Sequence, residues 1–335
     1  MDIISTLKEL SNSTYIGHHN DAIKIAEQML GDFSKKELSA GNTAFYFKGK
    51  KDKTFLLEAH IDEIGFVVTE VFDSGFLRVS TAGGFDLRAL PSHRIIIHGK
   101  EKVSAVFTSI PPHLSKDEAV FDDIDKLYLD TGLGDKAKSL ISVGDFATYD
   151  TQATELLGTR ITGKSLDNRA GVTTLLAVAE RISANCGYNV ILLFCNGEEI
   201  GTRGAITSAF ALDADEAICV DVSFGDFPGV GAAESGKLGA GPMIGCSPIL
   251  DRNMFARLCE LAENKGISYQ REIMSGRTST DADMVSVSKS GIPTALISIP
   301  LRNMHTDCEL CDTADIASAA ELIYEYIVSG GVCRD

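Results

Sequence analysis

The hydrophobic pattern of the chain changes twice along its length. Residues 2–30 carry an apolar stripe of helical spacing that stops at Gly31, which predicts a helical segment. From Phe66 to about Leu157 short β-like runs alternate with Gly, Pro and Asp, and this texture predicts a compact, all-β region resembling a small barrel. The β-like runs are FVVTEVF, FLRVS, HRIIIHG, VSAVFTSI and FATYD.

After Gly158 helical patterns alternate with wholly apolar strands, which indicates an α/β layer with a buried sheet. The segment Thr54–His60, TFLLEAH, is a strand of the same kind, so the β-rich region interrupts an α/β domain. We therefore predict an α/β fold with a mixed sheet flanked by helices, built from residues 1–65 and 158–335, with 66–157 as the insert. The expected later elements are helices at 169–182 and 253–265 and strands at 190–194, 217–220 and 294–299.

Composition excludes several classes of protein. The chain has 47 acidic and 31 basic side chains, a formal net charge of −16, and no basic cluster, which argues against a nucleic-acid partner. Its longest apolar run, Val190 to Cys195, is too short to cross a membrane. The N-terminus has no signal-peptide pattern. These features predict a cytoplasmic protein without a membrane partner.

The eight cysteines lie in the second half of the chain, several of them inside apolar runs, which favours buried free thiols over disulfides. Cys308 and Cys311 have CxxC spacing, but no second pair completes a tetrahedral zinc site. We interpret this pair as structural.

Potential metal ligands fall where strands end or helices begin. They are His60, Asp62, Asp167, Glu198, Glu199, Asp221 and His305. In open α/β sheets binding sites form outside the carboxyl ends of the strands, so residues far apart in sequence can converge there. Two histidines with several carboxylates form a nitrogen and oxygen ligand set suited to Zn, Co or Mn. We therefore predict a dinuclear divalent metal site.

Taken singly, each of these residues has an ordinary structural explanation, such as a helix cap for Asp167. Local spacing strengthens the metal hypothesis. In HIDEIG an extended backbone puts His60 and Asp62 on the same side, where Asp62 can orient the imidazole. In NGEEIG the adjacent Glu198 and Glu199 point differently, so one can bind metal while the other remains free as a base.

Five segments together resemble a known family. EAHIDEIGF, GKSLDNRAGV, NGEEIGTRGA, CVDVSF and IPLRNMHTDCE, in this order, are similar to motifs of the tetrahedral or glutamyl aminopeptidases, cocatalytic metallopeptidases of which some have been labelled endoglucanase-like. The resemblance spans nearly the whole chain and includes GGFD, PPHL and the TDA at Thr280–Ala282. It implies a zinc-peptidase-like α/β domain interrupted by a small β-barrel-like domain.

The resemblance also implies a role for each candidate residue. Asp167 would bridge two divalent ions, Glu198 would be the general base and Asp62 would orient His60. The implied activity is a metal-dependent aminopeptidase that removes N-terminal residues from peptides. The implied assembly is a homo-oligomer, a dodecamer built from dimers. The metal ligands would be His60 and Asp221 at one ion, Glu199 and His305 at the other, and Asp167 at both.

Some positions depart from the family pattern. STYIGHHNDA stands where relatives more often have a Ser-Gly-Glu-like run, and we expect its His18 and His19 to face solvent. LRALPSHR, and the Arg277–Ser279 segment before TDA, also differ. None of these positions is an implied ligand, so they bear on substrate choice and assembly.

Two other functions are possible from the sequence. A glycan hydrolase could use the paired carboxylates, but such enzymes need no metal, and this chain has no Trp and only 7% aromatic residues to stack on sugars. A non-catalytic metal-binding scaffold is disfavoured because Glu198, which a pseudoenzyme could lose, is present.

Overall fold

An eight-stranded mixed sheet forms the centre of the main domain. A computed structural model describes residues 1–31, 33–111, 113–114 and 124–332. The strand order is β17-β16-β18-β15-β5-β14-β4-β3. The four middle strands are parallel and almost wholly buried, as expected for a sheet covered on both faces. The strands are β3 (Ser34–Glu37), β4 (Thr43–Phe47), β5 (Thr54–His60), β14 (Asn189–Cys195), β15 (Glu216–Phe224), β16 (Met243–Cys246), β17 (Gln270–Ile273) and β18 (Thr294–Leu301).

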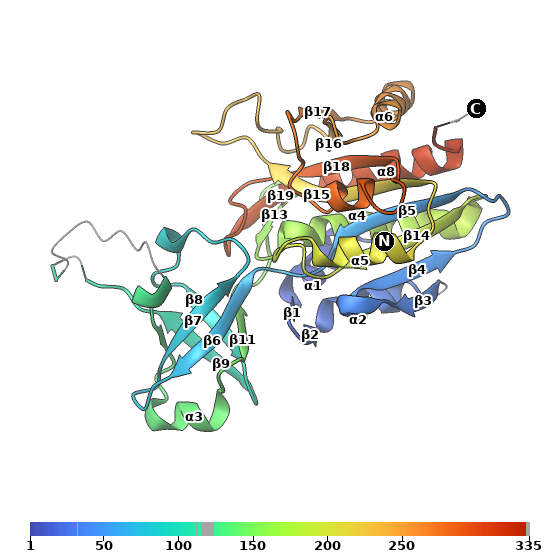
Figure 1. Cartoon of the computed structure of the whole chain (residues 1–335). Helices are drawn as coiled ribbons and strands as arrows, with labels where there is room; N and C mark the ends of the chain where they lie inside the picture. The colour runs from blue at the N-terminus through green and yellow to red at the C-terminus, as the bar shows by residue number, and fades with distance from the viewer. Residues whose placement is uncertain (32, 112, 115–123, 333–335) are drawn as a thin grey trace.

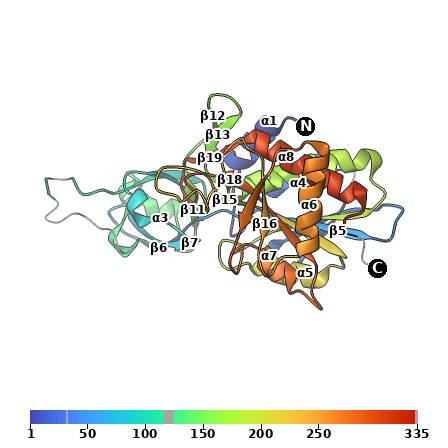
Figure 2. The same cartoon turned by 90° about the horizontal axis from the view of Figure 1, so that it is seen from above.

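Helices cover both faces of this sheet (Figures 1 and 2). Alternate residues of β5 enter two separate cores, with Phe55 and Leu57 in one and Leu56 in the other. The first core is closed by α1 (Ile3–Asn12), α2 (Asp21–Met29), α4 (Leu166–Asn185), α6 (Arg252–Lys265) and α8 (Thr313–Ser329). The second, smaller core is closed by α5 (Arg203–Ala211) and α7 (Ala282–Ser286).

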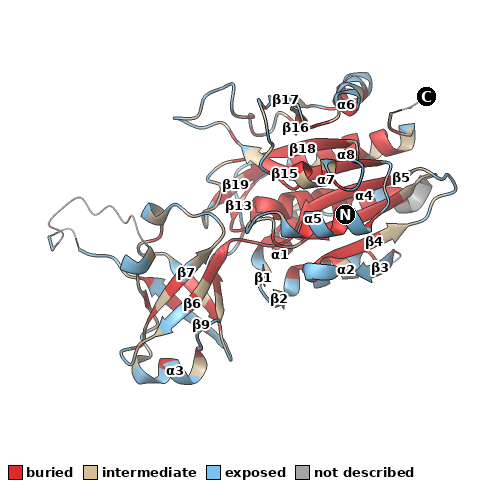
Figure 3. Ribbon diagram, in the orientation of Figure 1, coloured by how far each residue is buried: buried red, intermediate tan, exposed pale blue. Residues whose placement is uncertain are grey.

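A closed barrel projects from one end of the main domain (Figures 1 and 3). Its strand order is β10-β7-β6-β11-β8-β9, and it has its own apolar core that includes Phe66, Leu77, Ile95 and Phe107. The predicted fold class, an α/β domain interrupted by a small barrel, is therefore confirmed. The barrel contains β6 (Gly65–Val71), β7 (Phe76–Ala82), β8 (Arg94–His98), β9 (Lys102–Phe107), β10 (Leu129–Asp130) and β11 (Phe146–Tyr149), with the short α3 (Ala137–Leu140).

Smaller sheets complete the structure, and one of them corrects a prediction. The single helical segment expected at residues 2–30 is wrong: α1 and α2 are separated by a hairpin of β1 (Tyr15–Ile16) and β2 (His19–Asn20). Gly17, with φ of +58°, makes the reversal, and the apolar Tyr15 and Ile16 are buried beside it. The third sheet joins β12 (Thr154–Glu155), β13 (Arg160–Gly163) and β19 (Glu309–Asp312).

The long helices and strands predicted after Gly158 are present, with ends that differ by a few residues. The strand expected at 217–220 is longer, since β15 continues to Phe224. The helices α5 and α8 were not predicted. The buried residues of α8 lie on one side of the helix, but its other side also carries Ala317, Tyr324 and Val328, so the contrast between an apolar and a polar face is weak in the sequence. No helix within the described residues has the length and apolarity that crossing a bilayer requires.

Candidate metal centre

The structure brings all seven predicted site residues together at the carboxyl edge of the parallel strands. His60 ends β5, Asp221 lies near the end of β15, and Asp167 lies in the first turn of α4. Glu198 and Glu199 follow β14, and the loop after β18 carries His305. Four of these side chains are buried, namely His60, Asp62, Asp167 and Asp221. Convergence at this edge is the arrangement that the strand order of an open α/β sheet produces.

Asp167 lies between two pairs of candidate ligands. Its Oδ1 is 3.1 Å from Nε2 of His60, and that Nε2 is 3.6 Å from Oδ1 of Asp221. Its Oδ2 is 3.3 Å from Nε2 of His305, which is also 3.3 Å from Oε2 of Glu199. Within each trio one ligand atom per residue lies within 4.8 Å of the others. Each oxygen of Asp167 thus faces its own histidine and carboxylate.

The carboxylates at this centre repel one another and, among the described residues, have no Lys or Arg partner. Among the described residues Asp167, Glu199 and Asp221 form ion pairs only with His60 and His305. Burial raises the pKa of Asp221 and, together with Asp167, raises that of Glu199 well above its usual range. Burial also opposes ionisation of Asp167, but hydrogen bonds from His305 and His60 lower its pKa. Such an excess of buried negative charge suits bound divalent cations.

Glu198 differs from Glu199 in its surroundings. Burial raises the pKa of the Glu198 carboxyl to about 8, and the nearby carboxylates of Asp221 and Asp167 add to this effect. Glu198 forms no ion pair with any described residue, whereas Glu199 contacts His305. One ligand atom each of Glu198, His60 and Glu199 lies within 4.8 Å of the others, so Glu198 stands beside the centre, and without an ion pair its carboxyl is available to exchange a proton.

Asp62 holds the turn that carries both glutamates. Its Oδ1 accepts a hydrogen bond from the amide of Glu198 at 3.2 Å, and its Oδ2 accepts one from the amide of Glu199 at 3.3 Å. Oδ1 also lies 3.6 Å from Nδ1 of His60, slightly beyond hydrogen-bond distance. Asp62 thus lies against the His60 ring while fixing the backbone of Glu198 and Glu199.

A buried ion-pair network fixes the segment behind the centre. Glu63 Oε2 accepts hydrogen bonds from Nζ of Lys164 at 2.5 Å and from Oγ of Ser165 at 2.6 Å. The guanidinium of Arg169 donates to the carbonyl of Ile61. These contacts join the chain after β5 to the start of α4, the two segments that carry His60 and Asp167, so their relative position is determined by buried bonds.

Glu309, which no sequence pattern singled out, joins two segments that carry candidate ligands. Its Oε1 accepts the amide of His305 at 2.8 Å, and its Oε2 accepts the amide of Asp167 at 3.0 Å. His305 has a φ of +62°, an uncommon conformation for a residue with a side chain. Glu309 follows His305 by four residues in the last family-like motif, but only the fold shows that it also reaches Asp167.

The barrel contributes a residue to the same centre. The His305 imidazole hydrogen-bonds to the backbone of Gly84, which lies in the loop after β7. A Cβ atom on Gly84 would be 3.2 Å from Nδ1 of His305, which is a tight contact. The glycine in the GGFD segment therefore allows the barrel to approach the candidate ligand His305 closely.

The residues outside the centre agree with the predictions in part. His18 is exposed, as expected, but His19 is half-buried with its ring 4.8 Å from that of His98, so the prediction of a solvent-facing His19 is wrong. Cys308 is exposed and Cys311 is buried, and both are free thiols. Neither the histidine pair nor the cysteine pair joins the seven site residues.

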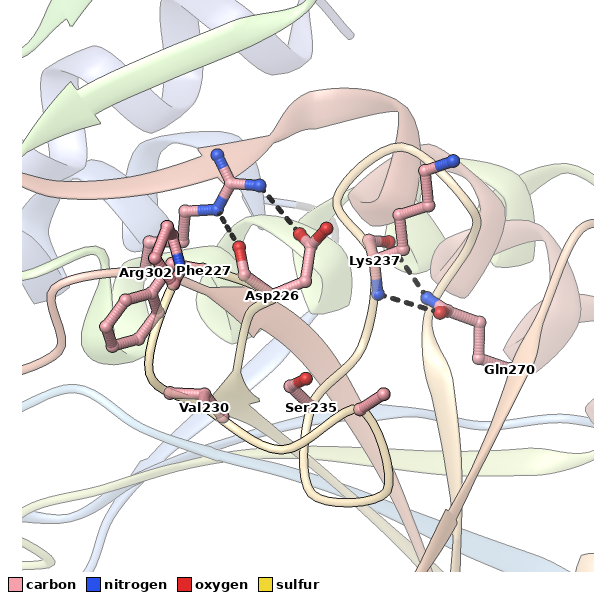
Figure 4. A pocket seen from close by; sticks show the side chains of 9 residues that line it. Asp226, Phe227, Val230, Ser235, Lys237, Gln270 and Arg302 are labelled. Carbon is pink, nitrogen blue, oxygen red and sulfur yellow. Dashed lines mark hydrogen bonds and ion pairs between the residues drawn. The ribbon is translucent and has the colours of Figure 1, made fainter.

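A cavity of about 610 Å³ lies beyond the ends of β15 and β18, on the same edge of the sheet (Figure 4). Arg302 lines it and pairs with Oδ1 of Asp226 at 2.7 Å, while Gln270 hydrogen-bonds to both backbone groups of Lys237. Apolar side chains of Phe227 and Val230 complete the wall. The cavity wall is therefore partly polar and partly apolar. Of its two cationic side chains, Arg302 forms an ion pair and Lys237 forms none with the described residues.

Comparison with known proteins agrees with this geometry. Residues 41–322 match the model of the M42 glutamyl aminopeptidase family. A lysyl aminopeptidase of Pyrococcus furiosus is 29% identical over 84% of this chain and 83% of its own. Among solved structures, an aminopeptidase of the archaeon Desulfurococcus kamchatkensis is 30% identical, with a TM-score of 0.91 over 98% of this chain and 94% of its own. The TET1 peptidase of Pyrococcus horikoshii, which can assemble into a tetrahedron or a large octahedral shell, is 27% identical with a TM-score of 0.85, covering 97% and 99%.

Proposed function

The chain belongs to the M42 glutamyl aminopeptidase family and is an aminopeptidase, a hydrolase of peptide bonds, and from this we propose that it works through two divalent metal ions and a glutamate base. Members of this family are metallopeptidases, which implies that the chain uses divalent metal ions. That there are two ions, and that they are Zn, Co or Mn, is our proposal. The proposed ligands are His60, Asp167, Glu199, Asp221 and His305.

The position of Asp167 carries this proposal. Each oxygen of Asp167 faces a separate histidine and carboxylate, so Asp167 can bind both ions. The two ions would have no other ligand in common. Each ion would have one imidazole and carboxylate oxygens, a set that zinc and cobalt accept with a position left open for substrate. The crowding of buried carboxylates without Lys or Arg partners also supports binding of cations.

The proposed mechanism assigns each proton to a residue. When bound, the two ions would supply Lewis-acid polarisation of the scissile carbonyl and acidify a water molecule. Glu198 accepts a proton from this water and then donates it to the leaving amine, first as a base and then as an acid. Asp62 keeps Glu198 in place through its amide and holds the His60 ring.

The experiment that tests this function compares wild type with Glu198→Gln on aminoacyl anilides with acidic, basic and apolar side chains, an N-acetylated control and a cellulose oligomer. We expect cleavage of free substrates alone, and a fall in kcat of about 10²–10⁴-fold in the variant with both metal ions retained. Glu101→Gln, at an exposed turn of the barrel, is the matched control and should change nothing. If Glu198→Gln loses its metal instead, the roles of the two glutamates are reversed. Cleavage of the glycan alone would refute the assignment.

We propose that the chain forms a homo-oligomer, a dodecamer built from dimers, that acts on peptides. The P. horikoshii TET1 peptidase and a dodecameric relative support this assembly. Exposed apolar side chains on the outside of α5 and after α7, namely Ile206, Phe210 and Val287, offer a surface for a second copy. Light scattering after gel filtration measures the mass directly. We also propose a cytoplasmic location, which the free thiols of the described cysteines support.

A further inference from the structure

A second group of titratable side chains lies beneath the metal centre, in the core between the sheet and the helices α5 and α7. Its members are Glu58 of β5, Cys195 of β14, Cys219 of β15 and Asp281 at the N-terminus of α7. All four are buried, with Glu58 only 1% and Asp281 only 2% exposed. The surrounding core is otherwise apolar and contains residues such as Leu56, Leu193 and Val285. Nothing in the proposed mechanism uses this group.

The strand register brings these side chains together. Glu58 and Cys219 are direct neighbours across β5 and β15, and Cys195 is the neighbour of His60 on the other side of β5. One oxygen or sulfur atom of each of Glu58, Cys195 and Asp281 lies within 4.8 Å of the other two. Cys195 and Cys219 lie in the same core as the Glu58 side chain's apolar neighbours, on the face of the sheet covered by α5 and α7. Three potential ligands therefore converge on one place, and Cys219 lies beside them as the direct neighbour of Glu58.

The two carboxyl groups lack the partners that buried carboxylates need. Oε1 of Glu58 and both carboxylate oxygens of Asp281 accept no hydrogen bond from any amide, hydroxyl or amine in the described part of the chain. Asp281 occupies the N-cap position of α7 without capping the helix through its side chain. No Lys or Arg forms an ion pair with either group among the described residues. A buried, unpaired carboxylate is strongly unfavourable, so a cation or protons must compensate this cluster.

Two protons would neutralise both carboxyl groups, but they would give no role to the two thiols that lie beside them in the same core. A divalent cation would take both carboxylates as ligands and would bind sulfur as thiolate, so each thiol that coordinates it releases its proton on binding. Two oxygen and two sulfur donors from separate elements suit tetrahedral Zn²⁺, which accepts both ligand types. The cation therefore gives all four side chains a role, whereas protonation involves the two carboxyl groups alone.

We propose that Glu58, Cys195 and Asp281 bind a third divalent cation of the zinc class, with Cys219 as the fourth donor. Glu58 precedes His60 by two residues, about 6.6 Å along the strand, so this ion would tie β5, β14 and β15 to α7 directly beneath the catalytic ligands. The site is separate from the proposed dinuclear centre, shares no ligand with it, and stands on its own geometry.

Cobalt substitution tests the site, because the dinuclear centre has only nitrogen and oxygen ligands. Thiolate-to-Co(II) charge-transfer absorption can therefore come only from a cysteine site. The exposed Cys308, and Cys333, which lies outside the described residues, are replaced by Ser in every sample to remove adventitious binding. We expect the Co(II)-loaded protein to contain three ions per chain and to show the thiolate band.

In this background Cys195→Ser should abolish or strongly reduce the thiolate band and lower the content from three ions to two. The matched control is Cys259→Ser, which changes a buried thiol of α6 in the other core and should alter neither result. Asp281→Asn provides a second variant of nearly identical shape. It should lose the third ion as well, and circular dichroism shows whether each variant is folded.

Two bound cobalt ions without a thiolate band would overturn the proposal and leave the cluster as a proton-sharing pair. A band that persists unchanged in Cys195→Ser and Cys219→Ser would overturn it too. One ion with a thiolate band that Cys195→Ser removes would support this site while refuting the dinuclear centre. The number of bound ions and the thiolate band together therefore distinguish failure of this third site from failure of the dinuclear centre.

Discussion

Replacing Glu309 by Gln tests how the fold positions two of the proposed metal ligands at once. The Glu309 carboxylate is 1% exposed and accepts the amide of His305 with one oxygen and the amide of Asp167 with the other. Gln keeps the shape but has a single oxygen, so one of the two amides would face an NH₂ group. A buried amide without an acceptor costs about 1–3 kcal/mol.

This cost can be relieved only by moving a ligand segment. Either Asp167 shifts, which affects both proposed ions, or His305 leaves its left-handed conformation, which affects one. We therefore expect the affinity for metal to fall by about 10- to 100-fold, the range seen when groups that support metal ligands are removed. Competition against a fluorescent chelator measures this affinity, and denaturant unfolding of the metal-free protein measures stability.

The matched control is Glu216→Gln. Glu216 is equally buried, pairs with Lys53 and accepts a hydrogen bond from the hydroxyl of Tyr326 at 2.8 Å, but it lies at the start of β15, five residues before Asp221. The Glu216→Gln variant should therefore be less stable than wild type but should bind metal with the same affinity. If the two variants lose similar stability and Glu309→Gln binds metal as tightly as wild type, then Glu309 supports the fold alone and the reasoning is refuted.

Three further changes have defined outcomes. Asp167→Asn should weaken both proposed ions by metal analysis, and loss of one ion alone would contradict a bridging role. Gly84→Val places a side chain against His305 and should lower kcat/KM about 10- to 100-fold with little change in melting temperature; an unchanged kcat/KM would show that the barrel loop yields freely. Burial lowers the pKa of His98 from 6.5 to about 4, so the folded protein keeps it neutral, with Nε2 2.9 Å from Oγ1 of Thr148. As the pH falls, His98 becomes protonated in the unfolded chain at a higher pH than in the folded protein, which favours unfolding. About 3 kcal/mol of stability that is present above pH 6.5 is therefore lost as the pH falls toward 4. His98→Gln should flatten this dependence in unfolding measured at pH 7 and 4.5, and an unchanged slope would refute it.

The sequence by itself determined the architecture and the chemistry of the ligand set. A run such as VILLFC is apolar on both faces, which predicts a buried strand, and polar residues that follow such a strand lie at the sheet edge. Short-range spacing also placed Asp62 on the His60 side of the chain. These features depend on neighbours in sequence, which is why they could be predicted.

Only the tertiary structure decided how residues far apart in sequence meet. That each oxygen of Asp167 faces a different histidine, that Glu309 reaches its amide, and that Gly84 of the barrel touches His305 depend on packing between separate elements. The cluster around Glu58 was hidden for the same reason: strand register and α7 bring its members together. In the N-terminal region the helical stripe was misleading, because a hairpin with Gly17 at φ of +58° outweighed local periodicity once Tyr15 and Ile16 could be buried. Local pattern specifies which surface an element buries, whereas contact between elements depends on the free energy of the whole fold.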